Sequence, residues 1–498
     1  MEKGQICELR IEDMSSEGSG IGRIAEVESA GSTETGLVVF VPGTVPGDLA
    51  KVKLTKVKKR YAFGEVVEIV EASPDRIEEA VCPYSDRCGG CPYIGIRYEA
   101  QLAIKEKQVR EKLERIGGVD FGRAGFNPII PAEGIYGYRN KAVMPISTGG
   151  LMTEKGGIQH PVHEPRIGFR PAKSHEVTDC TTCLLQTEAA MAAAEATRRF
   201  MDEDHICSYD KRWDKGLLHG MTVRTAFGTG EVMVIYDING KGIPNAAKLI
   251  QYLDDAIYEA GLYDDGSDAD SEEPESYYTL ESVVIRNGKK TETLAGKSTI
   301  TDVVEVGGRQ LEFEISADSF YQVNHQQMQN LYSVVRDYCG QAVQASASTG
   351  KPVILDLYCG IGTIGLCMAD MAEHVHGIEI VKQAVLDANR NATVNGIVNA
   401  TYKCGKAEEI LHEEEAVKEL SPDIAILDPP RAGCKENLLT AIAGAGIRNI
   451  IYVSCDPATL ARDVKILRDN GYELVEATPV DMFPNTLHVE TVCLLSRV

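Results

Sequence analysis

The sequence predicts a multidomain α/β protein with an N-terminal OB-like β-barrel, a β-rich central domain and a C-terminal doubly wound Rossmann-like domain. Its 498 residues exceed the ~250–300 that one hydrophobic core usually holds. Short strands with Gly and Pro turns fill the N-terminal part, which is typical of a small barrel. From about residue 310 strand and helix patterns alternate, as in a doubly wound sheet. We place the three domains at residues 1–72, 73–308 and 309–498.

Composition limits the class of protein. Hydrophobic residues make up 43% and charged residues 25%, which is ordinary for a soluble globular protein. No apolar run approaches the ~18–20 residues of a membrane span, and the first residues do not resemble a signal peptide, so we expect a cytoplasmic protein without membrane contact. In a reducing compartment, the 14 cysteines point to metal binding or catalysis rather than to disulfides.

A net charge of −23 argues against a nucleic-acid partner unless basic residues are gathered locally. They are gathered in residues 51–60, where apolar and basic residues alternate and no acidic residue occurs. One face of such a strand would pack while the other presents cations to phosphate. The alternative is a solvated edge strand whose lysines only prevent aggregation. The candidate RNA-binding residues are Lys51, Lys53, Lys56, Lys58, Lys59 and Arg60.

Three cysteines, Cys82, Cys88 and Cys91, lie close together in the sequence, with Gly89 and Gly90 between the last two. Glycines let the backbone bend closely around a bound group. A fourth thiolate is needed to close the site, and the segment Thr178–Leu184 offers two, at Cys180 and Cys183. Four thiolates suit zinc as well as an iron–sulfur cluster, so the spacing leaves both open.

The rest of the first two domains contains one clear helix and one acidic tract. Apolar residues at helical spacing run through residues 96–117 and end at Gly117, so we expect a helix there, one able to pack on the catalytic domain. Residues 264–275 are acidic and nearly devoid of apolar residues, which is typical of an exposed loop.

The C-terminal domain begins with a strand at Val353–Leu357 and a glycine-rich turn around Gly360. A second strand, His374–Glu379, ends in a carboxylate able to bond ribose hydroxyls. This arrangement also fits a dinucleotide-binding dehydrogenase. The later strand that ends at Asp428, followed by two prolines, decides against that reading, because it is typical of methyltransferases.

The last motif is an apolar strand that ends in Ser454-Cys455-Asp456-Pro457, with Glu490 thirty-five residues after Cys455. Reactive groups in α/β sheets lie at the carboxyl ends of strands. A thiol at that place is able to attack an electron-poor ring carbon, and a carboxylate to remove a proton from the next carbon. Most cysteines in such positions only pack, because free Cys is among the most buried residue types.

Taken together, these motifs resemble the class I S-adenosylmethionine-dependent RNA uracil-C5 methyltransferases. The similarity is greatest to the branch that carries a TRAM domain and an iron–sulfur cluster and acts on 23S ribosomal RNA. It runs over nearly the whole chain, from the cysteines through the 318–324 segment and the 356–360 turn to Cys455 and Glu490. The acidic tract and the extra Cys180 depart from the family pattern.

The resemblance implies roles for single residues. Cys455 would be the nucleophile and Glu490 the base that removes the C5 proton. A [4Fe-4S] cluster would be held by Cys82, Cys88, Cys91 and Cys183. S-adenosylmethionine would be contacted by Gln322, Tyr358, Gly360, Glu379 and Asp428. The partner would be ribosomal RNA and not DNA, and the protein a monomer. Two alternatives stay open: the same chemistry on transfer RNA, and a non-catalytic RNA-binding factor.

Overall fold

The computed structural model describes the chain except for residues 25–35, 78, 80, 148–151, 156–157, 162–163, 172–173, 175, 212–213, 263–275, 346–349 and 413–419. The predicted acidic loop, residues 264–275, lies outside the described residues. None of the helices in the described part is both long enough and apolar enough to span a membrane.

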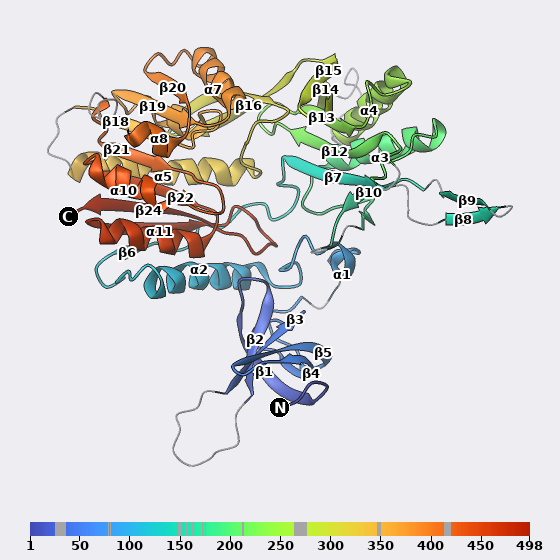
Figure 1. Cartoon of the computed structure of the whole chain (residues 1–498), viewed down its shortest axis with the longest axis horizontal. Helices are drawn as coiled ribbons and strands as arrows, with labels where there is room; N and C mark the ends of the chain where they lie inside the picture. The colour runs from blue at the N-terminus through green and yellow to red at the C-terminus, as the bar shows by residue number, and fades with distance from the viewer. Residues whose placement is uncertain are drawn as a thin grey trace, which may run out of the picture.

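The N-terminal part is a closed five-stranded barrel with the strand order β1-β2-β3-β5-β4, as predicted (Figure 1). Along β4 the side chains of Ala50, Val52 and Leu54 are fully buried, whereas Lys53 between the last two is exposed. This two-residue alternation makes one face of the strand core and the other surface. The register shifts between Leu54 and Lys56, and Lys56 is exposed. The strands are β1 (Ile6–Met14), β2 (Ser19–Ile24), β3 (Leu37–Pro42), β4 (Leu49–Val57) and β5 (Tyr61–Glu71).

The connection from the barrel leads to the C-terminal domain. After the short α1 (Ser85–Cys88), helix α2 (Tyr98–Arg115) lies within the range expected from the sequence. Its Val109 and Leu113 share a buried core with helix α11 (Pro457–Asp469), and β6 (Gly125–Phe126) then joins the edge of the C-terminal sheet. Residues that follow the barrel therefore pack onto the C-terminal domain before the central domain begins.

The central domain is built on one seven-stranded sheet with the order β11-β10-β7-β12-β13-β14-β15. Helices α3 and α4 pack together and bury Ala193, Phe200 and Leu253 in one core with the sheet (Figure 1). The elements are β7 (Lys141–Ser147), β10 (Arg166–Phe169), β11 (Thr178–Asp179), α3 (Glu188–Glu203), β12 (Leu218–Thr225), β13 (Glu231–Ile238), α4 (Ala246–Ala260), β14 (Thr279–Asn287) and β15 (Lys290–Gly296). Two hairpins flank it, β8 (Met152–Lys155) with β9 (Ile158–Pro161), and β16 (Thr299–Val306) with β17 (Arg309–Ser316).

The C-terminal sheet has the order β20-β19-β18-β21-β22-β24-β23-β6. The strands from β20 to β22 are parallel, and β24 is antiparallel to both of its neighbours. The elements are α5 (His325–Ala345), β18 (Val353–Leu357), α6 (Thr363–Met368), β19 (His374–Glu379), α7 (Lys382–Val394), β20 (Ala400–Cys404), α8 (Ala407–His412), β21 (Ile424–Leu427), α10 (Glu436–Gly444), β22 (Asn449–Ser454), α11, β23 (Tyr472–Val480) and β24 (Glu490–Arg497).

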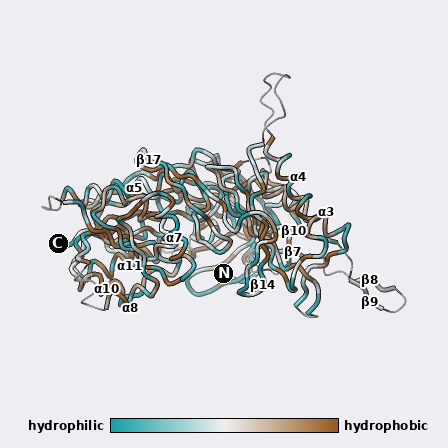
Figure 2. The backbone as a smooth tube through the Cα atoms, turned by 90° about the horizontal axis from the view of Figure 1, so that it is seen from above, coloured by the Kyte–Doolittle hydropathy of each residue, from teal (hydrophilic) through white to brown (hydrophobic). Residues whose placement is uncertain are grey.

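Both faces of this sheet are covered, which confirms the predicted doubly wound architecture. Ile354 packs with α5, α6 and α7 on one face, and its neighbour Leu355 packs with α2, α10 and α11 on the other. Figure 2 shows hydrophobic stretches gathered inside the part of the molecule that carries α5, α7 and α11. In such sheets ligands bind beyond the carboxyl ends of the parallel strands.

Candidate active site

The turn after β18 holds two predicted cofactor residues in unusual backbone conformations. Tyr358 has φ +63°, and Gly360 has φ +55°. A positive φ is costly for a residue with a side chain and is found mostly where a site requires it. The Gly360 N–H donates to Glu379 Oε2 over 3.2 Å, so the structure joins this turn to the end of β19. Glu379 Oε1 accepts a second bond, from the Val381 N–H over 2.8 Å.

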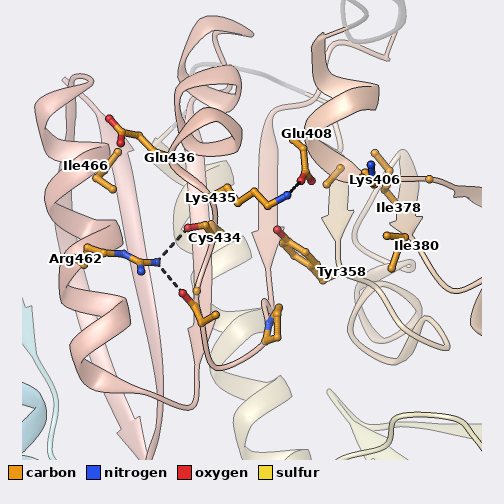
Figure 3. Close-up of a pocket in the computed structure, with 15 residues that line it drawn as sticks. Tyr358, Ile378, Ile380, Lys406, Glu408, Cys434, Lys435, Glu436, Arg462 and Ile466 are labelled. Carbon is orange, nitrogen blue, oxygen red and sulfur yellow. Dashed lines mark hydrogen bonds and ion pairs between the residues drawn. The ribbon is translucent and has the colours of Figure 1, made fainter.

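A cavity of about 660 Å³ opens beside this turn (Figure 3). Its volume is in the range of small-molecule and cofactor sites. Tyr358, Ile378 and Ile380 form one wall. Pro430, in the loop after β21, and Gly405, directly after β20, also line the cavity. The cavity therefore lies at the carboxyl ends of four parallel strands.

Sequence reasoning predicted Tyr358 in this cavity and missed most of the other lining residues. Lys406 comes from the loop after β20 and Glu408 from the first turn of α8, and Glu408 is ion-paired with Lys435 over 2.6 Å. Their only signal in the sequence is position, because both closely follow the end of β20. Asp356, on β18 shortly before the turn, is a further residue of interest. Burial raises its pKa to about 8, and its Oδ1 has no hydrogen-bond partner among the described residues.

The predicted nucleophile lies at the turn between β22 and α11. Cys455 is half-buried, and the next residue, Asp456, caps the helix by accepting from the Ala458 and Thr459 N–H groups over 2.8 and 2.9 Å. Pro457 occupies the first turn, where its missing N–H costs nothing. The end of β22 and the start of α11 are thus both fixed. They hold the Cys455 thiol at the carboxyl edge of the sheet, where ligands bind in such folds.

The carboxyl groups of Glu490 and Asp428 are close enough to this thiol to raise its pKa. Burial raises the pKa of the Cys455 thiol to about 12, the Glu490 carboxylate adds to the rise, and the Arg431 guanidinium opposes it. Burial, and then the Asp428 carboxylate, raise the pKa of Glu490 well above its usual range. Burial also raises the pKa of Asp428 to about 7. The structure therefore brings one thiol, two carboxyl groups and one cation into a single site.

Within this group Glu490 is exceptional. Only 3% of the residue is exposed, and in the described part of the chain its Oε2 has no hydrogen-bond partner. A buried carboxyl oxygen without a partner is costly unless a ligand supplies one. Glu490 thus has one buried oxygen available to a bound molecule.

Arg431 is a site residue that sequence reasoning did not single out. Its Nη2 donates to His488 Nε2 over 3.1 Å. Burial, together with nearby cations that include Arg431, lowers the pKa of His488 to about 4, so the imidazole is neutral and accepts this bond. Arg431 also follows Pro430, which lines the cavity, so one short loop connects the cavity with the thiol.

Gln322 lies on the segment before α5, and its side chain is buried. Its carbonyl accepts from Asn140 Nδ2 over 2.7 Å, and the nearby Asn324 donates to the Met482 carbonyl over 3.2 Å. Gln322 is therefore held between the central domain and the loop that leads to Glu490. It does not line the 660 Å³ cavity.

The cysteines form a second, separate site. Cys82, Cys88, Cys91 and Cys183 line one small cavity together with Cys180. Two distant segments of the chain thus meet, as predicted. The described residues contain no group of three or more His, Cys, Asp or Glu side chains arranged to hold a metal ion.

The predicted RNA-binding residues lie on the barrel (Figure 1), Lys51, Lys53 and Lys56 on β4 and the other three in the turn between β4 and β5. Lys53, Lys56, Lys58, Lys59 and Arg60 are exposed, but Lys51 is ion-paired with Glu68 of β5 over 2.8 Å. Acidic residues of the adjacent strand therefore offset part of the charge that the sequence of β4 alone indicated.

Known proteins resemble the chain along its full length. The family model described as tRNA (uracil-5-)-methyltransferase matches residues 264–498, and the TRAM domain model matches residues 1–67. Uncharacterized RNA methyltransferases of Halalkalibacterium halodurans and Clostridium acetobutylicum are each 36% identical, over 99% and 100% of this chain and 98% of their own lengths. The crystal structure of a Pyrococcus abyssi tRNA (uracil-54, C5)-methyltransferase in complex with S-adenosyl-L-homocysteine is 26% identical, with a TM-score of 0.68, over 98% of this chain and 99% of that one. The chain therefore belongs to the RNA uracil-C5 methyltransferase family and carries an N-terminal TRAM domain.

Proposed function

We propose that the protein transfers a methyl group from S-adenosylmethionine to C5 of a uridine in 23S ribosomal RNA, through a covalent adduct between Cys455 and C6 of the uracil. The observation that carries the proposal is the grouping of one half-buried thiol with Glu490, Asp428 and Arg431 at the edge of a methyltransferase sheet. The neighbouring cavity is large enough for the cofactor.

Cofactor binding is assigned to the turn after β18 and the end of β19. Glu379 accepts two backbone bonds but keeps free lone pairs for ribose hydroxyls, because a carboxylate has about four acceptor sites. Tyr358 and Ile380 supply apolar walls for a base. Burial raises the pKa of Asp356 to about 8 and that of Asp428 to about 7, and a bound sulfonium cation would favour the charged form of both carboxyl groups.

The reaction follows from the order of groups in the site. Cys455 first loses its thiol proton; the thiolate then adds its electron pair to C6, and the C5–C6 double-bond electrons move toward C5 and the ring carbonyl. C5 then attacks the sulfonium methyl carbon, and S-adenosylhomocysteine leaves with the electrons of the broken C–S bond. Glu490 takes the C5 proton, the double bond re-forms, and the C6–S electrons return to Cys455.

Transfer RNA is a second candidate substrate, and one observation favours it. The transfer-RNA enzyme of Pyrococcus abyssi is similar over 98% of this chain, a range that includes most of the barrel. The barrel therefore does not by itself favour ribosomal RNA, and the cysteine cavity remains as the main support for that substrate.

Methylation assays separate the two substrates. Purified protein should methylate 23S ribosomal RNA taken from a strain that lacks this protein, and 5-methyluridine should map to that RNA. Methylation of transfer RNA alone would reverse the assignment, and failure with both would favour a non-catalytic RNA-binding factor.

We assign a [4Fe-4S] cluster to Cys82, Cys88, Cys91 and Cys183. Four thiols suit such a cluster, and hydrogen bonds to the sulfurs are part of how proteins tune it. Backbone N–H groups of Leu185 and Gln186 bond the Cys183 sulfur. The thiols would have to draw together on loading, since their present arrangement does not match a metal site. When bound, the cluster would tie the two cysteine segments together, serving folding and RNA placement.

Replacement of single cysteines tests this assignment. Cys183→Ser should remove most of the iron and the brown colour of anaerobically prepared protein. The matched control is Cys180→Ser, because Cys180 lines the same cavity and should leave the iron content near that of the wild type. Loss of iron only in Cys180→Ser would mean that Cys180, and not Cys183, is the fourth ligand. Stoichiometric zinc in the wild-type protein would mean that the cysteines hold zinc and not an iron–sulfur cluster.

A further inference from the structure

Residues 481–489, here called the base loop, connect β23 to β24 and end immediately before Glu490. The loop carries His488, the partner of Arg431. Loops usually run over the surface, but Asp481, Asn485 and Val489 are buried. A buried loop needs partners for its backbone polar groups. Those partners come from parts of the molecule outside the C-terminal sheet.

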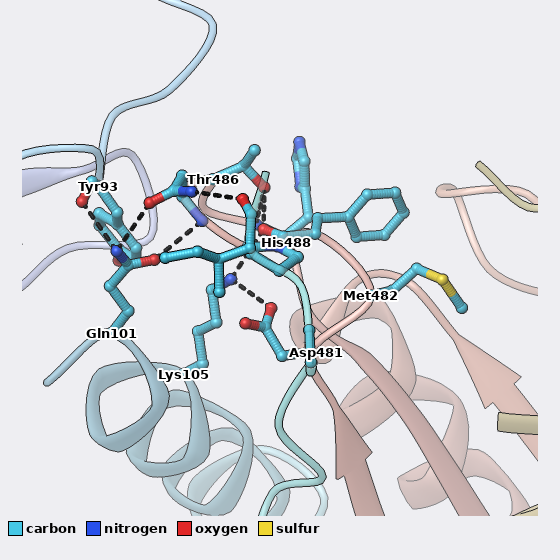
Figure 4. Close-up of polar contacts among 12 residues, drawn as sticks. Tyr93, Gln101, Lys105, Asp481, Met482, Thr486 and His488 are labelled. Carbon is cyan, nitrogen blue, oxygen red and sulfur yellow. Dashed lines mark hydrogen bonds and ion pairs between the residues drawn. The ribbon is translucent and has the colours of Figure 1, made fainter. Parts of the chain in front are cut away.

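Helix α2 holds the middle of the base loop (Figure 4). Gln101 Oε1 accepts from the Asn485 N–H over 2.9 Å, and Gln101 Nε2 donates to Asn485 Oδ1 over 3.0 Å. The Asn485 carbonyl accepts from the Tyr93 N–H over 3.1 Å, and Tyr93 directly follows the first cysteine segment. Asn485 has φ +65°, a conformation that these bonds hold in place.

The start of the base loop is fixed by a buried ion pair (Figure 4). Lys105 of α2 donates to Asp481 Oδ1 over 2.6 Å, and both side chains are fully buried. Lys105 also donates to the Phe483 carbonyl over 3.0 Å. From the central domain, the Tyr138 hydroxyl donates to the Pro484 carbonyl over 2.9 Å.

The N-terminal barrel touches the end of the base loop. Gly18, in the turn between β1 and β2, has φ +76°, and a Cβ atom added there would lie 2.9 Å from Leu487 Cδ2 and 3.3 Å from Pro92 Cβ. Leu487 also packs against a buried cluster that contains Met14 of the barrel and Tyr93. The neighbour of Leu487 in the chain is His488, at the active site.

We propose that the base loop couples the position of the N-terminal barrel to the catalytic base, so that barrel docking sets the rate of proton removal as well as RNA affinity. The inference rests on the proposed function. In that step the Glu490 carboxylate takes the C5 proton, the C–H electrons form the C5–C6 double bond, and the C6–S electrons return to Cys455. Gly18, Leu487, Gln101 and Lys105 act as positioning residues, because they reach the substrate only through the loop. A shift of about 1 Å at a reacting group can cost ~10²-fold in rate.

Two glycines of the barrel provide a matched test. Gly18 and Gly43 have nearly the same backbone conformation, φ +76° and +77°, but a Cβ at Gly43 would meet nothing within 4 Å. Alanine adds equal backbone strain at both, and only Gly18→Ala presses on the base loop. Leu487→Ala removes the same contact from the loop side without altering the barrel.

The measurements separate coupling from misfolding. RNA carrying 5-fluorouridine counts competent active sites, because it stays bound to the thiol. Per competent site, Gly18→Ala and Leu487→Ala should lower kcat roughly 10–100-fold without raising the KM for RNA, because slower release of the covalent intermediate lowers kcat and KM together. With ordinary RNA the covalent intermediate should accumulate, because only its release is slowed. Gly43→Ala should match the wild type.

Three results would overturn the coupling. They are equal kcat values for Gly18→Ala and Gly43→Ala, a rise in KM for RNA without loss of kcat, and a lower kcat without accumulated intermediate. The wild type tests the proposed function independently. If wild-type protein forms no adduct with 5-fluorouridine RNA while methyl transfer proceeds, the covalent mechanism fails and the coupling falls with it. A normal wild-type adduct together with any of the three results rejects the coupling alone.

Discussion

Ionisable side chains gather both at the carboxyl edge of the C-terminal sheet and along strand β4 of the barrel. The two places differ in how far these side chains are buried. At the sheet edge Glu490 is 3% exposed, and one of its oxygens has no partner among the described residues. On the barrel, Lys51 and Glu68 form an ion pair at 2.8 Å with side chains 44% and 57% exposed.

This difference in burial indicates which ionisable groups take part in a reaction. Electrostatic interactions are strong where water is excluded and weak where it is present. A buried group without a partner is costly for the fold, so its presence points to a ligand or a reaction. An exposed and paired group costs little and contributes mainly to long-range attraction of a charged partner. We therefore expect the largest effects from substitutions at the sheet edge and the smallest from those on the barrel.

Glu490→Gln should have the largest effect of the substitutions compared here. Glutamine keeps the shape of the side chain but cannot accept the C5 proton, so turnover should fall about 10²–10⁴-fold while a protein–RNA adduct accumulates. Glu473→Gln, on the exposed face of the adjacent β23, is the control and should keep normal turnover. Unchanged turnover in Glu490→Gln would assign proton removal to another group or to water.

Two lysines of α2 test the role of burial directly. Lys105 pairs with Asp481 with both side chains fully buried, whereas Lys107 pairs with Asp13 with side chains 48% and 36% exposed. Lys105→Met leaves a buried carboxylate alone and should destabilise the fold by about 3–5 kcal/mol. Lys107→Met should cost less than about 1 kcal/mol. Denaturant unfolding measures the free energy of unfolding of both variants. Equal losses of stability in the two would contradict the role assigned to burial.

Substitutions of the basic residues on the barrel should have the smallest effect, and they should change RNA binding only. Replacing Lys56, Lys58 and Lys59 with Ala should weaken RNA binding uniformly and flatten the slope of log affinity against log salt by ~0.7–0.9 per lost phosphate contact. Lys51→Ala should change the slope less, because Glu68 already pairs with Lys51. Methyl transfer at saturating RNA should persist. An unchanged slope in the triple variant would make the end of β4 and the turn after it an ordinary solvated surface.

The sequence predicted the parallel strands well, because a strand buried on both faces is a short apolar run with clear ends. The strands Val353–Leu357 and His374–Glu379 occur with those limits. The burial of Glu490 is harder to predict, because the pattern of an alternating strand alone also fits a solvent-facing residue. Its strand, β24, lies between β22 and β23 with both faces covered, so Glu490 is buried.

Features that depend on which segments meet in space were not predictable from one sequence. The pairing of Lys51 with Glu68 depends on the register between β4 and β5. The contact between Arg431 and His488 joins residues 57 positions apart. The base loop has no sequence pattern of its own, because its partners lie on α2, in the cysteine segment and on the barrel.

Reaction with RNA that carries 5-fluorouridine at the target position tests covalent catalysis by Cys455 most directly. Fluorine replaces the C5 hydrogen, so Glu490 has no proton to remove and the C6–S bond persists after methyl transfer. The account predicts a stoichiometric adduct that mass spectrometry locates on Cys455. Cys455→Ala should form none yet bind S-adenosylmethionine normally, and Cys404→Ala, which removes an exposed thiol at the end of β20, should behave as the wild type. An adduct in Cys455→Ala, or full turnover without Cys455, would contradict the account.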